Sequence, residues 1–157
     1  MGELTVKCYN KKIGLKRIAN AVYKTLNQTA DITVELGFMG EEDMRELNRE
    51  TRGVDKVTDV LSFPSLEGIR GKVLSAKDYP YDVDEDGKIF LGSIILCEER
   101  IKQQAEELGH DQKTERQYLI VHGLMHLFGY DHVDEGEDKK LMREKEKTAL
   151  KVLGVMQ

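Results

Sequence analysis

The sequence lacks several features that would assign it to a particular class of protein. It has only two cysteines, Cys8 and Cys97, and their spacing fits no metal-binding or redox motif. No apolar run approaches the ~20 residues that a membrane helix needs, and the N-terminal segment has no apolar signal core. With a formal net charge of −5, the chain also lacks the basic balance of a general nucleic-acid binder. We therefore expect a cytoplasmic protein with two buried, free thiols and no membrane partner.

The length and the apolar pattern predict the fold class. A chain of 157 residues predicts a single domain, residues 1–157, which can bury a core without disulfide bonds. Alternating or continuous apolar residues predict strands at 4–9, 32–38, 57–63 and 89–97. Apolar residues at helical spacing predict helices at 15–26, 41–50 and 98–108, a fourth from 114 and a fifth from 134. We expect a small α/β (α+β) fold, in which a mixed sheet of about four strands packs with about five helices.

Three further expectations concern helix ends and the longest connection. Thr114 and Gln117 predict a capping box at the start of the fourth helix. For the last helix we expect an N-cap at Asp134 and a stop at Gly154. Its inward-facing stripe is expected at Met142, Lys145, Ala149 and Val152. Residues 65–88 are mostly polar and interrupted by glycine and proline, which predicts a mobile loop or a loose hairpin.

The strongest chemical signal is a cluster of three histidines, His122, His126 and His132, in a protein that has only four. The first two are four positions apart, so on a helix they lie on one face and can bind one metal ion together. Gly129 can end that helix in a left-handed turn, after which the chain brings the third histidine back. Three imidazoles and one open position are typical of a catalytic zinc. Since the helix is apolar nearly all round, the metal site is expected on a central, buried helix.

The spacing of these histidines is shared with metalloproteases, but one residue of the protease pattern is missing. Those enzymes carry a glutamate beside the first histidine, and it acts as the general base. Here that position is Gly123, which can neither accept nor donate a proton. The sequence thus combines the metal ligands of that class with no protease base. A zinc-dependent, peptidase-like hydrolase therefore remains an alternative, but a weakened one.

Three segments together resemble the YbeY family of bacterial endoribonucleases, which are ribosomal RNA maturation factors. Residues 122–132 fit the family signature H-G-x-x-H-L-x-G-Y-D-H at every fixed position. A second segment covers residues 47–64, from Leu-Asn-Arg-Glu-Thr-Arg-Gly to Thr-Asp-Val-Leu-Ser-Phe-Pro. A third is the strand with Leu91-Gly92 and the helix that follows, with Gln104-Ala105-Glu106. One departure is Ser93, which stands where the family usually has an acidic residue.

The resemblance implies an endoribonuclease that cleaves single-stranded RNA. It implies one Zn²⁺ ion per chain, held by His122, His126 and His132, and an arginine, Arg52, that contacts phosphate in the RNA cleft. The implied role is maturation of the 3′ end of 16S ribosomal RNA and ribosome quality control. The expected partners are ribosomal RNA and the small ribosomal subunit, and we expect the protein itself to be a monomer.

The general base stays open at the level of sequence. Asp131 adjoins a metal ligand, so it is either a base or a hydrogen-bond acceptor that orients an imidazole. Asp59 in the second segment is a further candidate, and Tyr130 either donates a hydrogen bond in the site or packs in the core. The nucleophile is either water or the 2′-hydroxyl of the RNA. A remaining alternative is a ribosome-assembly factor whose metal is structural, with Asp131 as the closing ligand.

Overall fold

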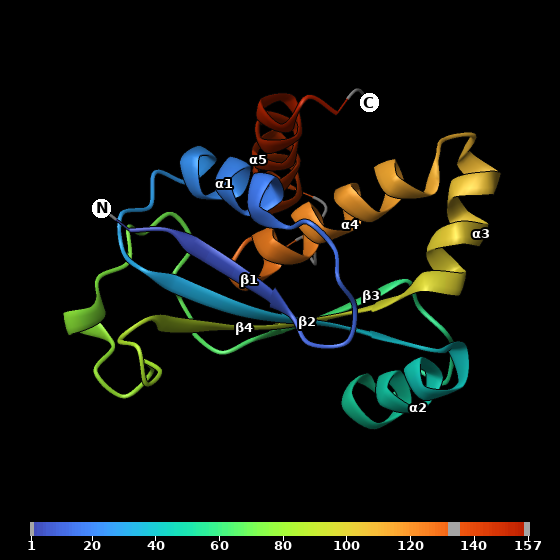
Figure 1. The fold of residues 1–157 in the computed structure, drawn as a ribbon, viewed down its shortest axis with the longest axis horizontal. Coiled ribbons are helices and arrows are strands. Elements are labelled where there is room, and N and C mark those ends of the chain that lie inside the picture. Colours follow the sequence, from blue (N-terminus) through green and yellow to red (C-terminus); the bar gives the residue numbers. More distant parts are fainter. Residues whose placement is uncertain (1, 132–135, 156–157) are drawn as a thin grey trace.

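The structure is a computed structural model that describes residues 2–131 and 136–155. Within these ranges the elements are β1 (Leu4–Cys8), α1 (Lys16–Thr25), β2 (Ile32–Met39), α2 (Glu41–Arg52), β3 (Val60–Pro64), the 3₁₀ helix η1 (Ala76–Asp78), β4 (Ile89–Cys97), α3 (Glu98–Leu108), α4 (Gln112–Leu127) and α5 (Glu137–Leu153). The four strands form one mixed sheet and five α-helices accompany it (Figure 1). The predicted α+β fold class is confirmed.

The strand order in the sheet is β1-β2-β4-β3. Strands β1, β2 and β4 are parallel, and β3 runs antiparallel to β4. β4 lies inside the sheet, which explains its nearly continuous apolar sequence. β3 occupies an edge and includes Pro64, because an edge position tolerates a residue that has no N–H to donate. The structure has this strand at Val60–Pro64, so it begins three residues later than the predicted range of 57–63 and ends one residue later.

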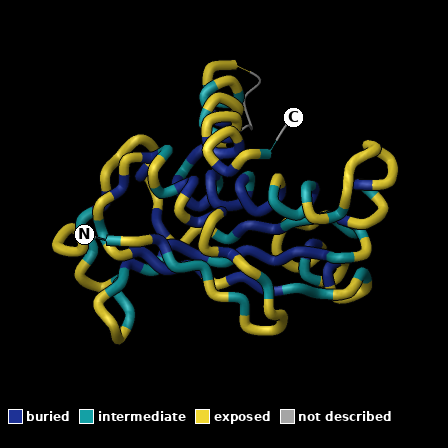
Figure 2. The backbone as a smooth tube through the Cα atoms, turned by 45° about the horizontal axis from the view of Figure 1, so that its top comes forward, coloured by how far each residue is buried: buried dark blue, intermediate teal, exposed yellow. Residues whose placement is uncertain are grey.

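The helices are divided unequally between the two faces of the sheet. Figure 1 shows α1, α4 and α5 on one side and α2 on the other, while α3 stands at the end of the sheet. On the crowded side α4 is in the interior, with buried Ile120, Leu124 and Met125. On the other side Met44 of α2 packs in a smaller apolar cluster with Leu61 and other sheet residues. Figure 2 shows the buried backbone concentrated in the sheet and in the helices next to it.

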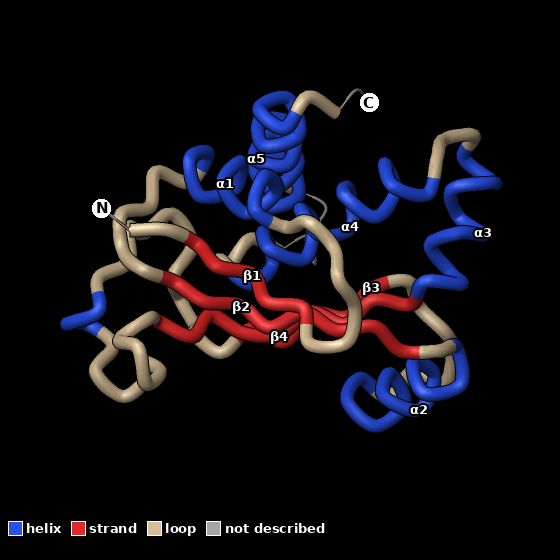
Figure 3. The backbone as a smooth tube through the Cα atoms, in the orientation of Figure 1, coloured by secondary structure: helices blue, strands red, loops and turns tan. Residues whose placement is uncertain are grey.

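The connection between β3 and β4 has little regular structure, as predicted, but it is anchored to the core. Figure 3 shows it as mostly loop, interrupted by the short η1 helix. Leu66, Ile69 and Leu74 are nevertheless buried. The amide of Gln28 holds the segment in place, since it donates to the Lys72 carbonyl at 2.8 Å and accepts from the Leu74 N–H at 3.0 Å. The expectation of a mobile or loosely paired segment is therefore corrected for residues 66–74.

Two expectations about the helices are wrong in detail. α4 begins at Gln112, because the side chain of Asp111 is the N-cap and accepts from the Thr114 N–H at 2.7 Å. In α5 the buried stripe is rotated from the predicted one, because Val152 is 55% exposed. The residues that α5 buries are Met142, Glu146, Ala149, Leu150 and Leu153. The helix does end at Gly154 as predicted, and Asp134 lies outside the described residues.

Both cysteines are free thiols, as expected, but only one is fully buried. Cys97 is buried and Cys8 is half-buried. Burial raises the pKa of the Cys97 thiol, which keeps it protonated and unreactive at neutral pH. In the part of the chain that the structure describes, no helix has the length and apolar character to cross a membrane.

Candidate active site

Two of the predicted metal ligands converge on one point from the same face of α4. The Nε2 atoms of His122 and His126 are 3.2 Å apart, and their rings are nearly perpendicular, at 89°. Two nitrogens bound to one tetrahedral zinc at 2.0–2.1 Å would lie about 3.3 Å apart. The observed separation therefore fits a shared zinc ion. Among the described residues no group of three potential ligands is present, and His132 lies outside them.

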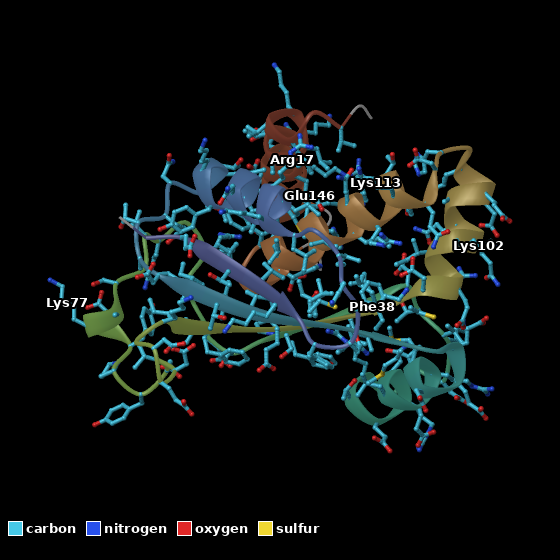
Figure 4. All side chains as sticks on the ribbon, viewed as in Figure 1. Arg17, Phe38, Lys77, Lys102, Lys113 and Glu146 are labelled. Carbon is cyan, nitrogen blue, oxygen red and sulfur yellow. The ribbon has the colours of Figure 1, made fainter. Side chains whose placement is uncertain are left out.

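The orientation of His122 is fixed by a residue that the sequence did not point to. Glu146 on α5 places Oε2 2.5 Å from Nδ1 of His122. Its side chain is only 6% exposed, so this interaction is shielded from water. A carboxylate that accepts a hydrogen bond from Nδ1–H fixes the proton on Nδ1, which leaves Nε2 as the nitrogen that binds metal. Figure 4 labels Glu146 where α5 passes over α4. The available signal was an acidic residue at a buried position of α5, which the incorrect helix phase concealed.

Gly123 has a packing role that excludes the protease arrangement. A Cβ at this position would lie 3.0 Å from Cδ1 of Ile94 and 3.2 Å from Oγ of Ser62. Gly123 therefore faces β3 and β4 at close range and lets α4 approach the sheet. A glutamate would have to enter this tightly packed interface. The missing protease base is thus explained by contact between helix and sheet.

The end of α4 forms the turn that the sequence predicted at Gly129. The Gly129 N–H donates to the His126 carbonyl and the Tyr130 N–H to that of Met125, both at 3.0 Å, while Gly129 has φ +94°. This is the Schellman arrangement, in which a left-handed glycine follows the last helical turn. A Cβ on Gly129 would also collide with the Arg70 backbone N at 2.9 Å. The turn directs the chain toward Asp131, which lines the cavity beside the histidines.

That cavity brings together predicted site residues that are far apart in the sequence. It has a volume of about 780 Å³, and its walls include Arg52, Asp59, His122, His126 and Asp131. Arg52 ends α2 on one side of β3, and α4 lies on the other side of the same strand. We call this space the histidine cavity. It has cationic, imidazole and carboxylate groups around one volume, which are the groups that phosphodiester cleavage requires.

The side chain of Arg52 is held in place at the edge strand. Its Nη2 donates to the Ser62 carbonyl at 2.8 Å, and its guanidinium lies 5.9 Å from the centre of the Phe63 ring. A guanidinium has five N–H donors, so this anchoring hydrogen bond leaves others for an anion in the cavity. Arg52 is therefore fixed in position and still able to make the forked contact that phosphate favours.

The other candidate residues differ in how they relate to the cavity. Asp59 and Asp131 both line it, and Asp131 is exposed. Tyr130 also lines the cavity, but its side chain is mostly buried in the core. Burial raises the pKa of Tyr130 more than Arg70 and a backbone hydrogen bond from Gly71 lower it. This favours the packing role for Tyr130. Ser93 is the neighbour of Ile94 in β4, and successive side chains of a strand point to opposite faces of the sheet. Because Ile94 contacts α4, the Ser93 side chain is directed away from α4.

Comparisons with known proteins agree on one family. The family model described as Endoribonuclease YbeY matches residues 4–154. A curated protein of that name from Clostridium kluyveri is 44% identical over 75% of this chain and 74% of its own length. Another from Clostridium tetani is 38% identical over 90% of this chain and 89% of its own. The solution structure of a Thermotoga maritima protein covers 96% of this chain and 90% of its own, with 27% identity and a TM-score of 0.60.

Proposed function

This chain belongs to the YbeY endoribonuclease family, and we propose that it is a metal-dependent endoribonuclease specific for single-stranded RNA. One observation carries the proposal beyond family membership. The anchored guanidinium of Arg52 and the converging Nε2 atoms of His122 and His126 line the same cavity. A phosphate grip and a pair of metal ligands around one space suit hydrolysis of a phosphodiester bond.

The metal we propose is a single Zn²⁺ ion, held by His122, His126 and His132. The 3.2 Å between the two described Nε2 atoms and the imidazole donor set support zinc. When bound, zinc supplies Lewis acidity, which activates water and stabilises negative charge on a phosphoryl oxygen. Glu146 keeps His122 in the tautomer and orientation needed for binding.

The protein residues bind the substrate and move the proton. Arg52 binds a non-bridging phosphate oxygen and places the scissile phosphate beside the histidines. Asp59, Glu67 and Asp131 are the carboxylates in the cavity that can accept a proton from the attacking hydroxyl, whether it belongs to water or to the 2′-position of the ribose. Unpaired RNA is the substrate we propose, because its backbone is not held in a duplex and can enter the cavity as a single strand.

Family membership supports a role for this activity in ribosomal RNA processing. We propose that the chain acts in the cytoplasm on ribosomal RNA in the small ribosomal subunit, in maturation of the 16S 3′ end and in ribosome quality control. Its net charge of −5 favours a substrate that is selected at a local site over general binding to nucleic acid.

The test combines metal analysis with three substrates. The purified protein is analysed for bound metal and then incubated with single-stranded RNA, duplex RNA and unfolded protein. We expect about one zinc per chain and cleavage of single-stranded RNA alone. Cleavage of the unfolded protein would instead support the peptidase alternative. Bound zinc without cleavage of RNA, either free or in small subunits, would support an assembly factor with a structural metal.

Substitutions separate metal binding from phosphate binding. His126→Ala should abolish cleavage and lower the zinc content, because one of the converging nitrogens is lost. Arg52→Ala should lower kcat/KM for RNA by about 100-fold while zinc content is unchanged, since the lost contact is to phosphate. Arg45→Ala is the matched control, because Arg45 is on the same helix but pairs with Asp55 outside the cavity. Wild-type turnover by Arg52→Ala would contradict the phosphate role.

A further inference from the structure

The histidine cavity adjoins a second cavity beside His122. This second space has a volume of about 330 Å³, and Asp59, Val60 and His122 belong to the walls of both. Its own walls come from α4 and α5 and include Tyr118, Lys139 and Arg143. We call it the Tyr118 pocket. A chain that passes through the histidine cavity can therefore extend into the Tyr118 pocket on the side of His122 away from His126.

Tyr118, His122 and His126 form one line along α4. They follow each other at four-residue spacing, so they share a face of the helix and are about 6 Å apart along its axis. The Tyr118 side chain is not part of the core, because the residue is 39% exposed. Its ring thus lies one helical turn before the first metal ligand, with one side open to the pocket.

The charges around the Tyr118 pocket suit a phosphate. Lys139 and Arg143 are four positions apart on α5, on the same face of that helix. Burial raises the pKa of Tyr118, the charge of Glu146 adds to this shift, and the charge of Arg143 opposes it. The pocket wall also carries two carboxylates: Glu146, which is engaged by His122, and Asp59, which lines both cavities. Two cations and an aromatic ring therefore lie together one turn from the proposed metal.

We propose that the Tyr118 pocket binds the nucleotide next to the scissile phosphate, on the opposite side of His122 from Arg52. This inference rests on the proposed function and identifies how its substrate is held. The nucleobase stacks on Tyr118, and the phosphate of the same nucleotide contacts Arg143 and Lys139. Stacking on an aromatic side chain requires a base that is not stacked in a duplex, so this pocket selects single-stranded RNA.

The test measures binding without cleavage. Fluorescence anisotropy with a labelled single-stranded oligoribonucleotide is recorded in a metal chelator, so that the RNA stays intact. Tyr118→Ala should weaken binding about tenfold, whereas Tyr118→Phe should keep wild-type affinity because it retains the stacking face. Tyr81→Ala is the control, since Tyr81 is 96% exposed and lines neither cavity. Equal affinity of wild type and Tyr118→Ala would overturn the inference.

The salt dependence of RNA affinity tests the roles of Lys139 and Arg143 independently of Tyr118. For single strands, each phosphate contact contributes about 0.7 to the slope of log K against log salt concentration. Because Lys139 and Arg143 contact the same phosphate, the double substitution Lys139→Ala and Arg143→Ala should reduce the slope by about 0.7. Lys147→Ala, on an exposed part of α5, should leave it unchanged. An unchanged slope in the double variant would contradict the phosphate contact.

Failure of this inference can be distinguished from failure of the proposed function. Wild-type protein that neither binds nor cleaves single-stranded RNA would overturn both. Wild-type protein that cleaves it, together with Tyr118 and cation variants that bind normally, would overturn the subsite alone. Circular dichroism and zinc content of each variant confirm that the fold and the metal site are retained.

Discussion

Glu146 is the residue on which the orientation of His122 depends. Its carboxylate is buried and lies 2.5 Å from Nδ1 of that histidine. Partners of this kind typically change metal affinity by 10–100-fold when they are removed. Glu146→Ala should therefore weaken zinc binding by about that factor, and Glu146→Gln by less, because an amide oxygen can still accept the hydrogen bond from Nδ1–H of His122. A competition titration against a chromophoric chelator measures both.

The control for these variants is Glu144→Gln, an exposed residue of the same helix. It should bind zinc like the wild type. If Glu146→Ala also kept wild-type zinc affinity, the carboxylate would have no role in positioning the imidazole, and its burial would have to be explained by packing alone.

Substitution of Gly123 tests whether the glutamate base of the proteases could be restored. Gly123→Glu should destabilise the fold by about 3–5 kcal/mol, because the carboxylate would be buried without a partner against Ile94 and Ser62. Gly123→Ala should cost less, since only the flexible end of Ile94 and the Ser62 hydroxyl have to yield. Urea denaturation measures both. A stable Gly123→Glu variant that cleaves peptides would show that the packing argument is wrong.

Some residues of the site could be predicted from the sequence and others could not. The His122–His126 pair and the turn at Gly129 follow from helical spacing and glycine chemistry, so they were predicted from local sequence alone. Glu146 was not, because its partner lies on another helix and the predicted stripe of α5 was rotated by one residue. A charged side chain on a buried helical face is visible in a sequence only when the phase of the helix is known.

At the scale of elements, Glu98 ties the starts of α3 and α4 to the loop before α1. Its carboxylate accepts hydrogen bonds from Lys11, Gln112 and Arg116. Desolvation raises the pKa of Glu98, but these hydrogen bonds outweigh it and hold the pKa below its ordinary value. The ionised form is therefore the one that stabilises the folded protein.

The pH dependence follows from the direction of this shift. With a folded pKa below the unfolded value of about 4.3, Glu98 contributes its full stabilisation above that value. The contribution is lost as the pH falls through the lower, folded pKa. In urea denaturation Glu98→Gln should cost about 1 kcal/mol at pH 7, and this cost should shrink as the pH falls through the folded pKa of Glu98. Glu107→Gln, at an exposed position of α3, should show no such difference. A cost independent of pH would contradict the charge argument.

Element positions were predicted better than element ends. Every predicted strand and helix exists, because apolar periodicity reflects burial over many residues. The start of α4 was misplaced because Asp111 and Thr114 are both capping residues, and only the observed bond from the Thr114 N–H to Asp111 decides between them. β3 begins three residues later than predicted, at Val60, and extends to Pro64, which an edge strand accommodates.

At the scale of the whole molecule, the site depends on a strand order that no local pattern contains. Placing β3 antiparallel at the edge beside β4 puts Arg52 and the α4 histidines around the same strand. Local patterns predicted each segment, and only the family resemblance connected them. The Tyr118 pocket was missed for the same reason, since it forms only where α5 packs against α4.

Zinc binding should stabilise the whole fold, because two of its proposed ligands, His122 and His126, lie on the buried helix α4, and Glu146 of α5 braces His122. Zinc at 100 times its dissociation constant adds about 2.7 kcal/mol to the free energy of unfolding. For a chain of this size that corresponds to a rise in Tm of about 5–10 °C. Thermal denaturation followed by circular dichroism, with zinc and with a chelator, measures the rise. It should be absent in His126→Ala, and magnesium should not replace zinc, because it prefers oxygen ligands over imidazole. If zinc left the Tm of the wild type unchanged, or raised that of His126→Ala equally, the proposed ion would not be bound at this pair of histidines.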